Sequence, residues 1–126
     1  MLTDKKKILL VDDDKAVSES VKSILEETEK YEVRTFANAR GVFSLARAYQ
    51  PDLVVLDISM PYKDGSEIAA ELQSDPKTAA IKIIFLTAIV TPDEARGQTQ
   101  SGGIPVLAKP VNVMSFLACV DKLLRY

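Results

Sequence analysis

Four stretches of the chain are apolar throughout, and each runs directly into a polar residue. They span residues 8–11, 53–56, 83–86 and 104–108. An apolar run without alternation predicts a strand buried on both faces, as in the middle of a parallel sheet. Residues 31–36 alternate between apolar and polar instead, which predicts a further strand nearer the edge of that sheet.

Segments with apolar residues at helical spacing separate the predicted strands. Asn38 and Asn112 are candidate N-caps for two of these helices, and Pro51 and Pro76 limit two of them. The expected buried positions are Val17, Val21, Ile24, Leu25 and Thr28; Val42, Phe43, Leu45, Ala46 and Tyr49; Ile68, Ala69 and Leu72; and Val113, Phe116, Leu117, Val120, Leu123 and Leu124. Alternating strands and helices favour an α/β fold. We predict one domain over residues 1–126, with a doubly wound five-stranded parallel sheet in the order 2-1-3-4-5.

The segment between the fourth and fifth predicted strands is unusual. Residues 91–94 have the pattern of a helix start, with an N-cap, a proline at the first position and acids in the first turn. Residues 95–101 then contain a glycine and no large apolar side chain. A helix here would have little to bury, so we expect it to be short or frayed.

The residues that end the buried strands carry the candidate chemistry. The first strand runs into Asp12 and Asp13, the third into Asp57, the fourth into Thr87 and the fifth into Lys109. Open α/β sheets bind ligands at the carboxyl ends of their strands. Because neighbouring strands lie ~4.8 Å apart, the predicted strand order would bring these side chains together.

The composition excludes several classes of protein. The chain has 126 residues, a net charge of −2 and no histidine, which rules out histidine-based zinc sites and histidine-based acid–base catalysis. Nothing recommends direct binding of nucleic acid or membrane, and the basic run Lys5–Lys7 is expected to be a solvated edge. The single cysteine, Cys119, is expected to be a buried thiol, which suits the reducing cytoplasm.

Carboxylates gathered in one pocket need positive charge to offset their repulsion. Mg²⁺ suits such a pocket because it binds carboxylate oxygens and keeps several waters, whereas oxygen ligands argue against zinc or copper. A carboxylate beside such an ion can attack phosphorus and form an aspartyl phosphate. Lys109 would then offer a fixed positive charge, and Thr87 a hydroxyl, to the phosphoryl oxygens.

Taken singly, each of these residues has an ordinary explanation as a cap, a strand-end residue or a solvated charge. Asp14 is itself expected to cap the first helix. Together, however, they resemble the receiver domain of two-component response regulators, over essentially the whole chain. The motifs that carry the resemblance are Asp12-Asp13, Asp57 with Met60-Pro61 and Asp64-Gly65, Leu86-Thr87-Ala88, and Lys109-Pro110, whose peptide bond is cis in the family.

The resemblance implies a flavodoxin-like three-layer sandwich and a signalling domain that is not an enzyme in the usual sense. It implies that Asp57 accepts a phosphoryl group from a histidine kinase or phosphotransfer protein, assisted by Thr87 and Lys109. It further implies that Asp13, Asp57 and the backbone carbonyl of Ser59 hold Mg²⁺, with Asp12 acting through water. Phosphorylation would then change the conformation of the domain for signalling to a downstream target.

Two departures from the family pattern bear on how the domain signals, whereas a third, Lys82 in place of a common proline, is taken as neutral. Val106 stands three residues before the lysine, where the family usually has an aromatic residue, and the helix before the last strand lacks its usual apolar anchors. We expect the Val106 side chain to pack in the core. We further expect that signalling uses a rearranged or disordered helix before the last strand, or that the domain mainly exchanges phosphate. A docking module that never gains phosphate is the alternative. A hydrolase of the haloacid dehalogenase type fits poorly, because residues 12–16 lack its signature and no cap segment is present.

Overall fold

The structure, a computed structural model, describes residues 5–58, 65–88, 99–101 and 103–124. Its strands are β1 (Lys6–Val11), β2 (Tyr31–Phe36), β3 (Leu53–Asp57), β4 (Lys82–Thr87), β5 (Thr99–Ser101) and β6 (Ile104–Ala108). Its helices are α1 (Lys15–Glu26), the short 3₁₀ helix η1 (Ala39–Gly41), α2 (Val42–Tyr49), α3 (Gly65–Ser74) and α4 (Val113–Leu124). Among the residues described, no helix is both long enough and apolar enough to cross a membrane.

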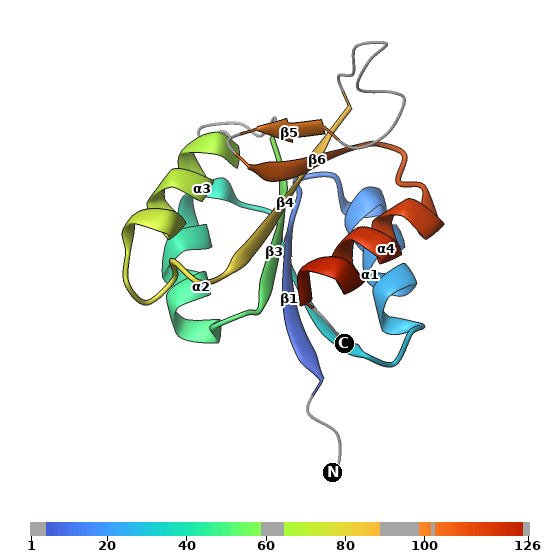
Figure 1. Cartoon of the computed structure of the whole chain (residues 1–126), viewed down its shortest axis with the longest axis horizontal. Coiled ribbons are helices and arrows are strands. Elements are labelled where there is room, and N and C mark those ends of the chain that lie inside the picture. Colours follow the sequence, from blue (N-terminus) through green and yellow to red (C-terminus); the bar gives the residue numbers. More distant parts are fainter. Residues whose placement is uncertain (1–4, 59–64, 89–98, 102, 125–126) are drawn as a thin grey trace.

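The strands form one sheet in the order β2-β1-β3-β4-β6-β5 (Figure 1). Along the order from β2 to β6 each neighbouring pair is parallel, whereas β5 pairs antiparallel with β6. The predicted order 2-1-3-4-5 of parallel strands is therefore confirmed, with β6 as its fifth member. The structure adds a short antiparallel strand at one edge.

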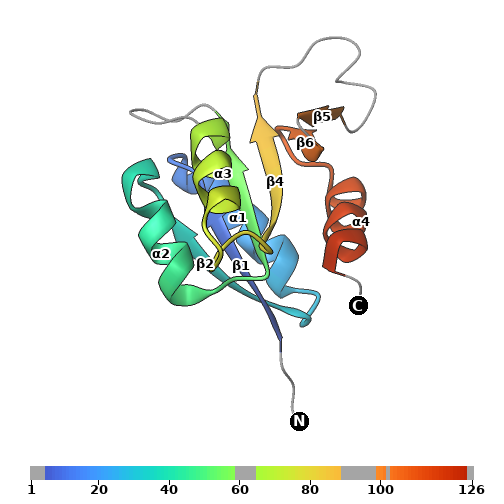
Figure 2. The same cartoon turned by 60° about the vertical axis from the view of Figure 1, so that its left-hand side comes forward.

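Helices cover both faces of the sheet, as the fully apolar strands require (Figures 1 and 2). One core layer lies under α2 and α3 and includes Leu9, Val54, Phe85, Val42, Ala46, Ile68 and Leu72. The other lies under α1 and α4 and includes Leu10, Val55, Ile84, Val21, Leu25, Phe116 and Val120. Successive strand residues alternate between these layers, so each central strand is held from both sides.

The helix caps largely follow the sequence. The Asp14 carboxylate accepts the amides of Ala16 and Val17 at the start of α1, as predicted. Asn112 accepts the amide of Ser115 at the start of α4. Asn38 caps η1, the 3₁₀ turn that precedes α2, and not α2 itself as predicted.

Val113 was expected in the core and is exposed to 45%. This prediction was wrong because Val113 is the first residue of α4, before the helix has turned its apolar stripe toward the sheet. The next apolar position of that stripe, Phe116, is fully buried.

The expected short or frayed helix before the last strand is wrong for residues 99–101. Residues 99–101 form β5 and pair with β6 through Thr99↔Val106 and Ser101↔Ile104. They are polar and β-permissive, and an edge position beside β6 satisfies their backbone without requiring an apolar face. The predicted helix start at residues 91–94 lies outside the described residues. Val106 is buried among core residues, as expected.

A polar link joins the edge strand β2 to the last helix. Tyr31, which is 1% exposed, donates its hydroxyl to the Asp121 carboxylate, and Lys30 Nζ lies 2.9 Å from the same oxygen. The hydrogen bond from Tyr31, followed by the bond and charge of Lys30, lowers the pKa of Asp121 below its ordinary value despite partial burial. The link therefore ties α4 to an element at the opposite edge of the sheet.

Replacing Tyr31 by phenylalanine should lower the free energy of unfolding by about 1 kcal/mol at neutral pH, the usual contribution of one such hydrogen bond. A lowered carboxyl pKa contributes stability that is present above the unfolded value of ~3.9 and is lost as the pH falls through the folded value. The difference between wild type and Tyr31→Phe should therefore shrink on acidification. Urea unfolding at neutral pH and at pH ~3 checks this, and a difference that grew at low pH would contradict it.

Candidate functional site

The sheet ladder continues beyond the ends of the strands and fixes the loops that carry the site. The amide of Asp12 donates to Phe36 O at 3.1 Å, and the amide of Ile58 donates to Leu86 O at 2.9 Å. The amide of Lys109 donates to Thr87 O at 2.8 Å. Strand-end residues on β1, β3 and β6 are therefore placed by the backbone of the neighbouring strand.

These strand ends bring together Asp12, Asp13 and Asp57. One carboxylate oxygen from each lies within 4.8 Å of those from the other two. Asp12 is 1% exposed and Asp57 is 4% exposed, whereas Asp13 faces solvent. The predicted acidic cluster is therefore formed, with two buried members and an open side at Asp13.

Lys109 reaches into the same cluster from the end of β6. Its Nζ lies 2.7 Å from Asp12 Oδ2 and 3.2 Å from Asp57 Oδ2, and its side chain is 14% exposed. Burial alone would lower the pKa of Lys109, but the carboxylates of Asp12 and Asp57 outweigh it and raise that pKa above the ordinary lysine value. Lys109 is therefore a fixed cation, and in the part of the chain that the structure describes its single positive charge meets a cluster of three carboxylates.

Asp12 shows that the cluster suits a further cation. Its Oδ1 accepts the amide of Asp14 at 2.8 Å, and its backbone carbonyl accepts the Ser18 hydroxyl at 3.4 Å. Its Oδ2 is buried, and Lys109 Nζ lies 2.7 Å from it. Among the described residues, three carboxylates share this single ammonium group, and such an excess of acids fits a hard divalent cation.

The remaining predicted residues are placed less completely. Thr87 ends β4, is 6% exposed, and follows Leu86, the residue in register with Asp57. Its backbone is thus next to the cluster. The carbonyl predicted for Ser59 and the Met60-Pro61 part of the motif lie outside the described residues. The Lys109-Pro110 peptide bond is cis, as the resemblance implied.

Gly65 has a role beyond that of a turn residue. Its amide donates to Ile58 O at 2.9 Å, which closes the loop after β3. A Cβ at this position would lie 2.9 Å from the carbonyl oxygen of Asp57, closer than real Cβ contacts allow. Only glycine lets α3 begin against the backbone of Asp57, a constraint that the sequence does not reveal.

Replacing Lys109 by methionine should lower the free energy of unfolding by about 3 kcal/mol in metal-free buffer, because the buried carboxylates lose their partner. A raised lysine pKa contributes stability that is present below the unfolded value of ~10.4 and is lost only as the pH rises through the folded value. The loss should therefore be equal at pH ~7 and ~9.

Urea unfolding of Lys109→Met measures this loss, with Lys22→Met on α1 as the matched control. Adding Asp57→Asn to Lys109→Met should recover part of the stability, because one buried charge is removed. Equal stabilities of Lys109→Met and Lys22→Met would show that the ion pairs do not stabilise the fold.

The chain was compared with known protein families and with curated relatives. Residues 8–121 match the family described as response regulator receiver domain. The DNA-binding dual master transcriptional regulator RpaA of Synechocystis sp. is 37% identical over 119 residues, which cover 94% of this chain and 49% of RpaA. Response regulator Rre1 of the same organism is 36% identical over 118 residues, covering 93% of this chain and 51% of Rre1. The chain thus spans about half the length of these curated relatives.

Solved structures agree with this placement. A response regulator from Desulfuromonas acetoxidans is 27% identical with a TM-score of 0.80, covering 95% of this chain and 97% of that one. A putative response regulator from Chloroflexus aurantiacus is 25% identical with a TM-score of 0.83, covering 98% and 100%. Because the family match runs from β1 into α4, the chain belongs to the response regulator receiver domain family. Receiver domains are signalling domains and not enzymes in the usual sense.

Proposed function

We propose that Asp57 accepts a phosphoryl group from a phosphohistidine on a partner kinase or phosphotransfer protein. The observation that carries this proposal is the contact of Lys109 Nζ with the buried carboxylates of Asp12 and Asp57. The chain has no histidine, so it cannot form the phosphohistidine donor itself. The family match supports the same role, since receiver domains work with histidine kinases.

In the transfer, an oxygen of the Asp57 carboxylate forms a bond to phosphorus. The phosphorus–nitrogen bond to the donor imidazole breaks, and its electron pair stays with the imidazole. Negative charge on the transferred group is spread over its oxygens, so catalysis depends on positive charge and on hydrogen-bond donors. Lys109 supplies that charge through an ammonium which its raised pKa keeps protonated. The Thr87 hydroxyl acts as a donor from the end of β4.

We assign Asp12, Asp13 and Asp57 to a Mg²⁺ site, with the Ser59 carbonyl as a further predicted ligand. When bound, Mg²⁺ offsets the repulsion between these carboxylates and the incoming phosphoryl oxygens. The support is the grouping of the three carboxylates around the ammonium group of Lys109. The exposed Asp13 leaves the site open to solvent, from which the ion and the donor can approach.

The surface beside Lys109 supports transfer from a protein donor. An apolar groove of about 240 Å³ lies between α1 and the segment after β6, lined by Ala16, Val17, Ser20, Val21, Lys109, Pro110 and Val111. A helix of a partner that lay in this groove would bring its phosphohistidine close to the acidic pocket. The buried thiol of Cys119, whose pKa burial raises, suits action in a reducing cytoplasm.

Asp57→Asn should abolish phosphorylation by a small acyl-phosphate donor in the presence of Mg²⁺, because the attacking carboxylate is gone. Intact-protein mass spectrometry measures the added phosphoryl group. Asp75→Asn is the matched control, since its side chain can still accept the amide of Lys77. Labelling of Asp57→Asn at the wild-type rate would contradict the assignment of Asp57. Absence of labelling in wild type would favour a docking module that never gains phosphate.

Asp13→Asn should weaken Mg²⁺ binding by at least ~10-fold, the scale on which loss of a metal-site partner acts. Asp13 is exposed, so the variant should fold normally. Titration calorimetry with Mg²⁺ measures the affinity, and Glu19→Gln removes an exposed acid of α1 as the matched control. Equal Mg²⁺ affinities of Asp13→Asn and Glu19→Gln would remove Asp13 from the site.

A further inference from the structure

A polar hollow of about 370 Å³ lies at the amino-terminal ends of the strands, at the pole opposite the acidic pocket. It is lined by Lys6, Gln50, Pro51, Asp52, Lys77, Ala80, Ile81, Lys82, Leu123 and Leu124. Figure 1 shows that the start of β1 and the end of α4 lie at this same end of the molecule. The phosphoryl-transfer chemistry proposed above uses none of these residues.

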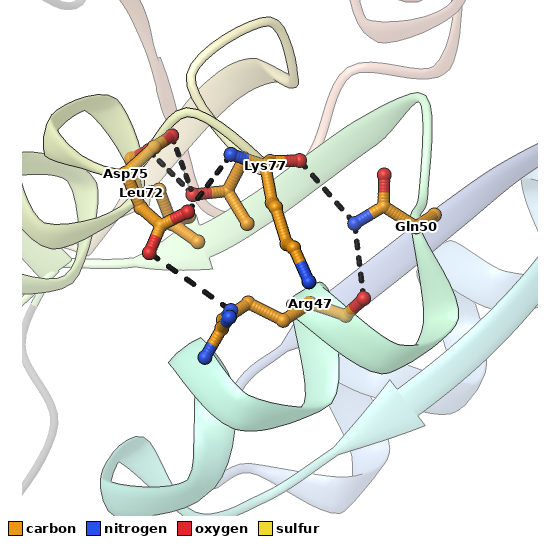
Figure 3. A network of polar contacts seen from close by, with 6 residues as sticks. Arg47, Gln50, Leu72, Asp75 and Lys77 are labelled. Carbon is orange, nitrogen blue, oxygen red and sulfur yellow. Dashed lines mark hydrogen bonds and ion pairs between the residues drawn. The ribbon is translucent and has the colours of Figure 1, made fainter.

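Backbone hydrogen bonds hold the walls of the hollow together. Asp52 N donates to Lys7 O at 2.8 Å, and Lys82 N donates to Asp52 O at 3.1 Å, which joins β1, β3 and β4 at their starts. The Gln50 side chain donates to Arg47 O at 2.9 Å and to Lys77 O at 3.3 Å (Figure 3). Gln50 therefore ties the end of α2 to the turn after α3, and the hollow has a preformed wall.

The hollow gathers lysines from three separate elements: Lys6 from β1, Lys77 from the turn after α3, and Lys82 from β4. Lys6 and Lys82 each lie two residues before a strand residue, Ile8 and Ile84, of the core layer under α1 and α4. Because residues two apart in a strand lie on the same face, both lysines belong to that face of the sheet. Lys7 belongs to the other face of the sheet, and its Nζ donates to Tyr49 O at 3.4 Å.

The acid in the lining is Asp52, whose Oδ2 accepts the amide of Lys7 at 2.8 Å. Asp52 remains a carboxylate, but three lysines outnumber it in the lining. A chain whose net charge is −2 therefore has a positively charged hollow at one pole.

We propose that this hollow binds a polyphosphate anion. Lys6 and Lys82 start strands separated by β3, and Lys6 lies two residues before Ile8, which is level with Lys82, so their backbones lie ~12 Å apart. A single phosphate would engage few of the lysines, whereas a chain of phosphates can meet an ammonium at each of several groups. Lysine recognises phosphate as a point charge, which suits an open site that needs no fixed geometry. The phosphate chain can be inorganic or the tail of a nucleotide.

The test is titration calorimetry of the full chain with inorganic tripolyphosphate at low salt, with EDTA present to keep metal from the acidic pocket. Binding should be measurable and should weaken with added salt, since the Debye length falls to ~8 Å at physiological ionic strength. Lys77→Gln and Lys82→Gln should each weaken binding by about fivefold, as loss of one charge–charge contact of ~1 kcal/mol predicts. Lys22→Gln, on α1, is the matched control and should bind as wild type.

Amide chemical shifts identify where the anion binds. Changes in residues 50–53 and 77–82 would support the hollow, whereas changes confined to the ends of β1, β3 and β6 near Lys109 would overturn it. Equal affinity for orthophosphate and tripolyphosphate, or no effect of the Lys77→Gln and Lys82→Gln substitutions, would also overturn the proposal. ATP distinguishes the sources: equal affinity indicates the phosphate chain alone, and tighter binding of ATP indicates a nucleotide.

Discussion

The contact of one lysine with two buried carboxylates is the interaction on which the site depends. Asp12 and Asp57 are almost completely buried, and carboxylates at such positions are costly unless a positive charge is close. Lys109 meets both, yet Asp13 adds a third acid and leaves the pocket with an excess of negative charge. This imbalance makes the pocket receptive to a cation and, once the cation is bound, to a phosphoryl group. The negative charge of the site thus follows from the number of acids and lysines as well as from their positions.

The sheet makes that arrangement possible. Parallel strands deliver their carboxyl ends to one edge, and the apolar layers on both faces hold the strands in register. The backbone ladder extends one residue past β1 and β6, through the amides of Asp12 and Lys109. The acids and the lysine are therefore positioned by the most buried part of the protein. A site that must hold like charges close together needs this rigidity, because flexible loops would let the charges separate.

Much of this could be predicted from the sequence, because continuous apolar runs identify buried strands and the polar residues that end them. That pattern and the handedness of the crossovers limit the possible strand orders, and choosing the doubly wound order among them predicts the convergence of Asp12, Asp57 and Lys109. Residues 99–101 could not be predicted as a strand, since their pairing with β6 depends on a tertiary neighbour and they carry no apolar pattern. Helical periodicity likewise could not show that Val113 precedes the first buried turn of α4.

Other features become visible only in three dimensions. The close approach of Gly65 to the carbonyl of Asp57 depends on how α3 meets β3, and an Asp-Gly pair in the sequence indicates only a turn. The burial of Asp12 Oδ2 against the ammonium group of Lys109 is likewise a property of the packed structure. Local sequence fixes the type of side chain at a strand end, whereas the tertiary fold decides which of its atoms are left to bind something else.

The two outermost strands also affect how the protein behaves among copies of itself. Sheet edges can recruit strands from other chains and so begin aggregation. At one edge of the described sheet lies β5, which carries the polar residues Thr99, Gln100 and Ser101. At the other, β2 carries Glu32 and Arg34, which are held against Tyr49 by a 2.6 Å hydrogen bond and a cation–π contact of 4.3 Å to the ring centroid. Charged side chains at the border formed by β2 therefore disfavour its pairing with the sheet of another copy.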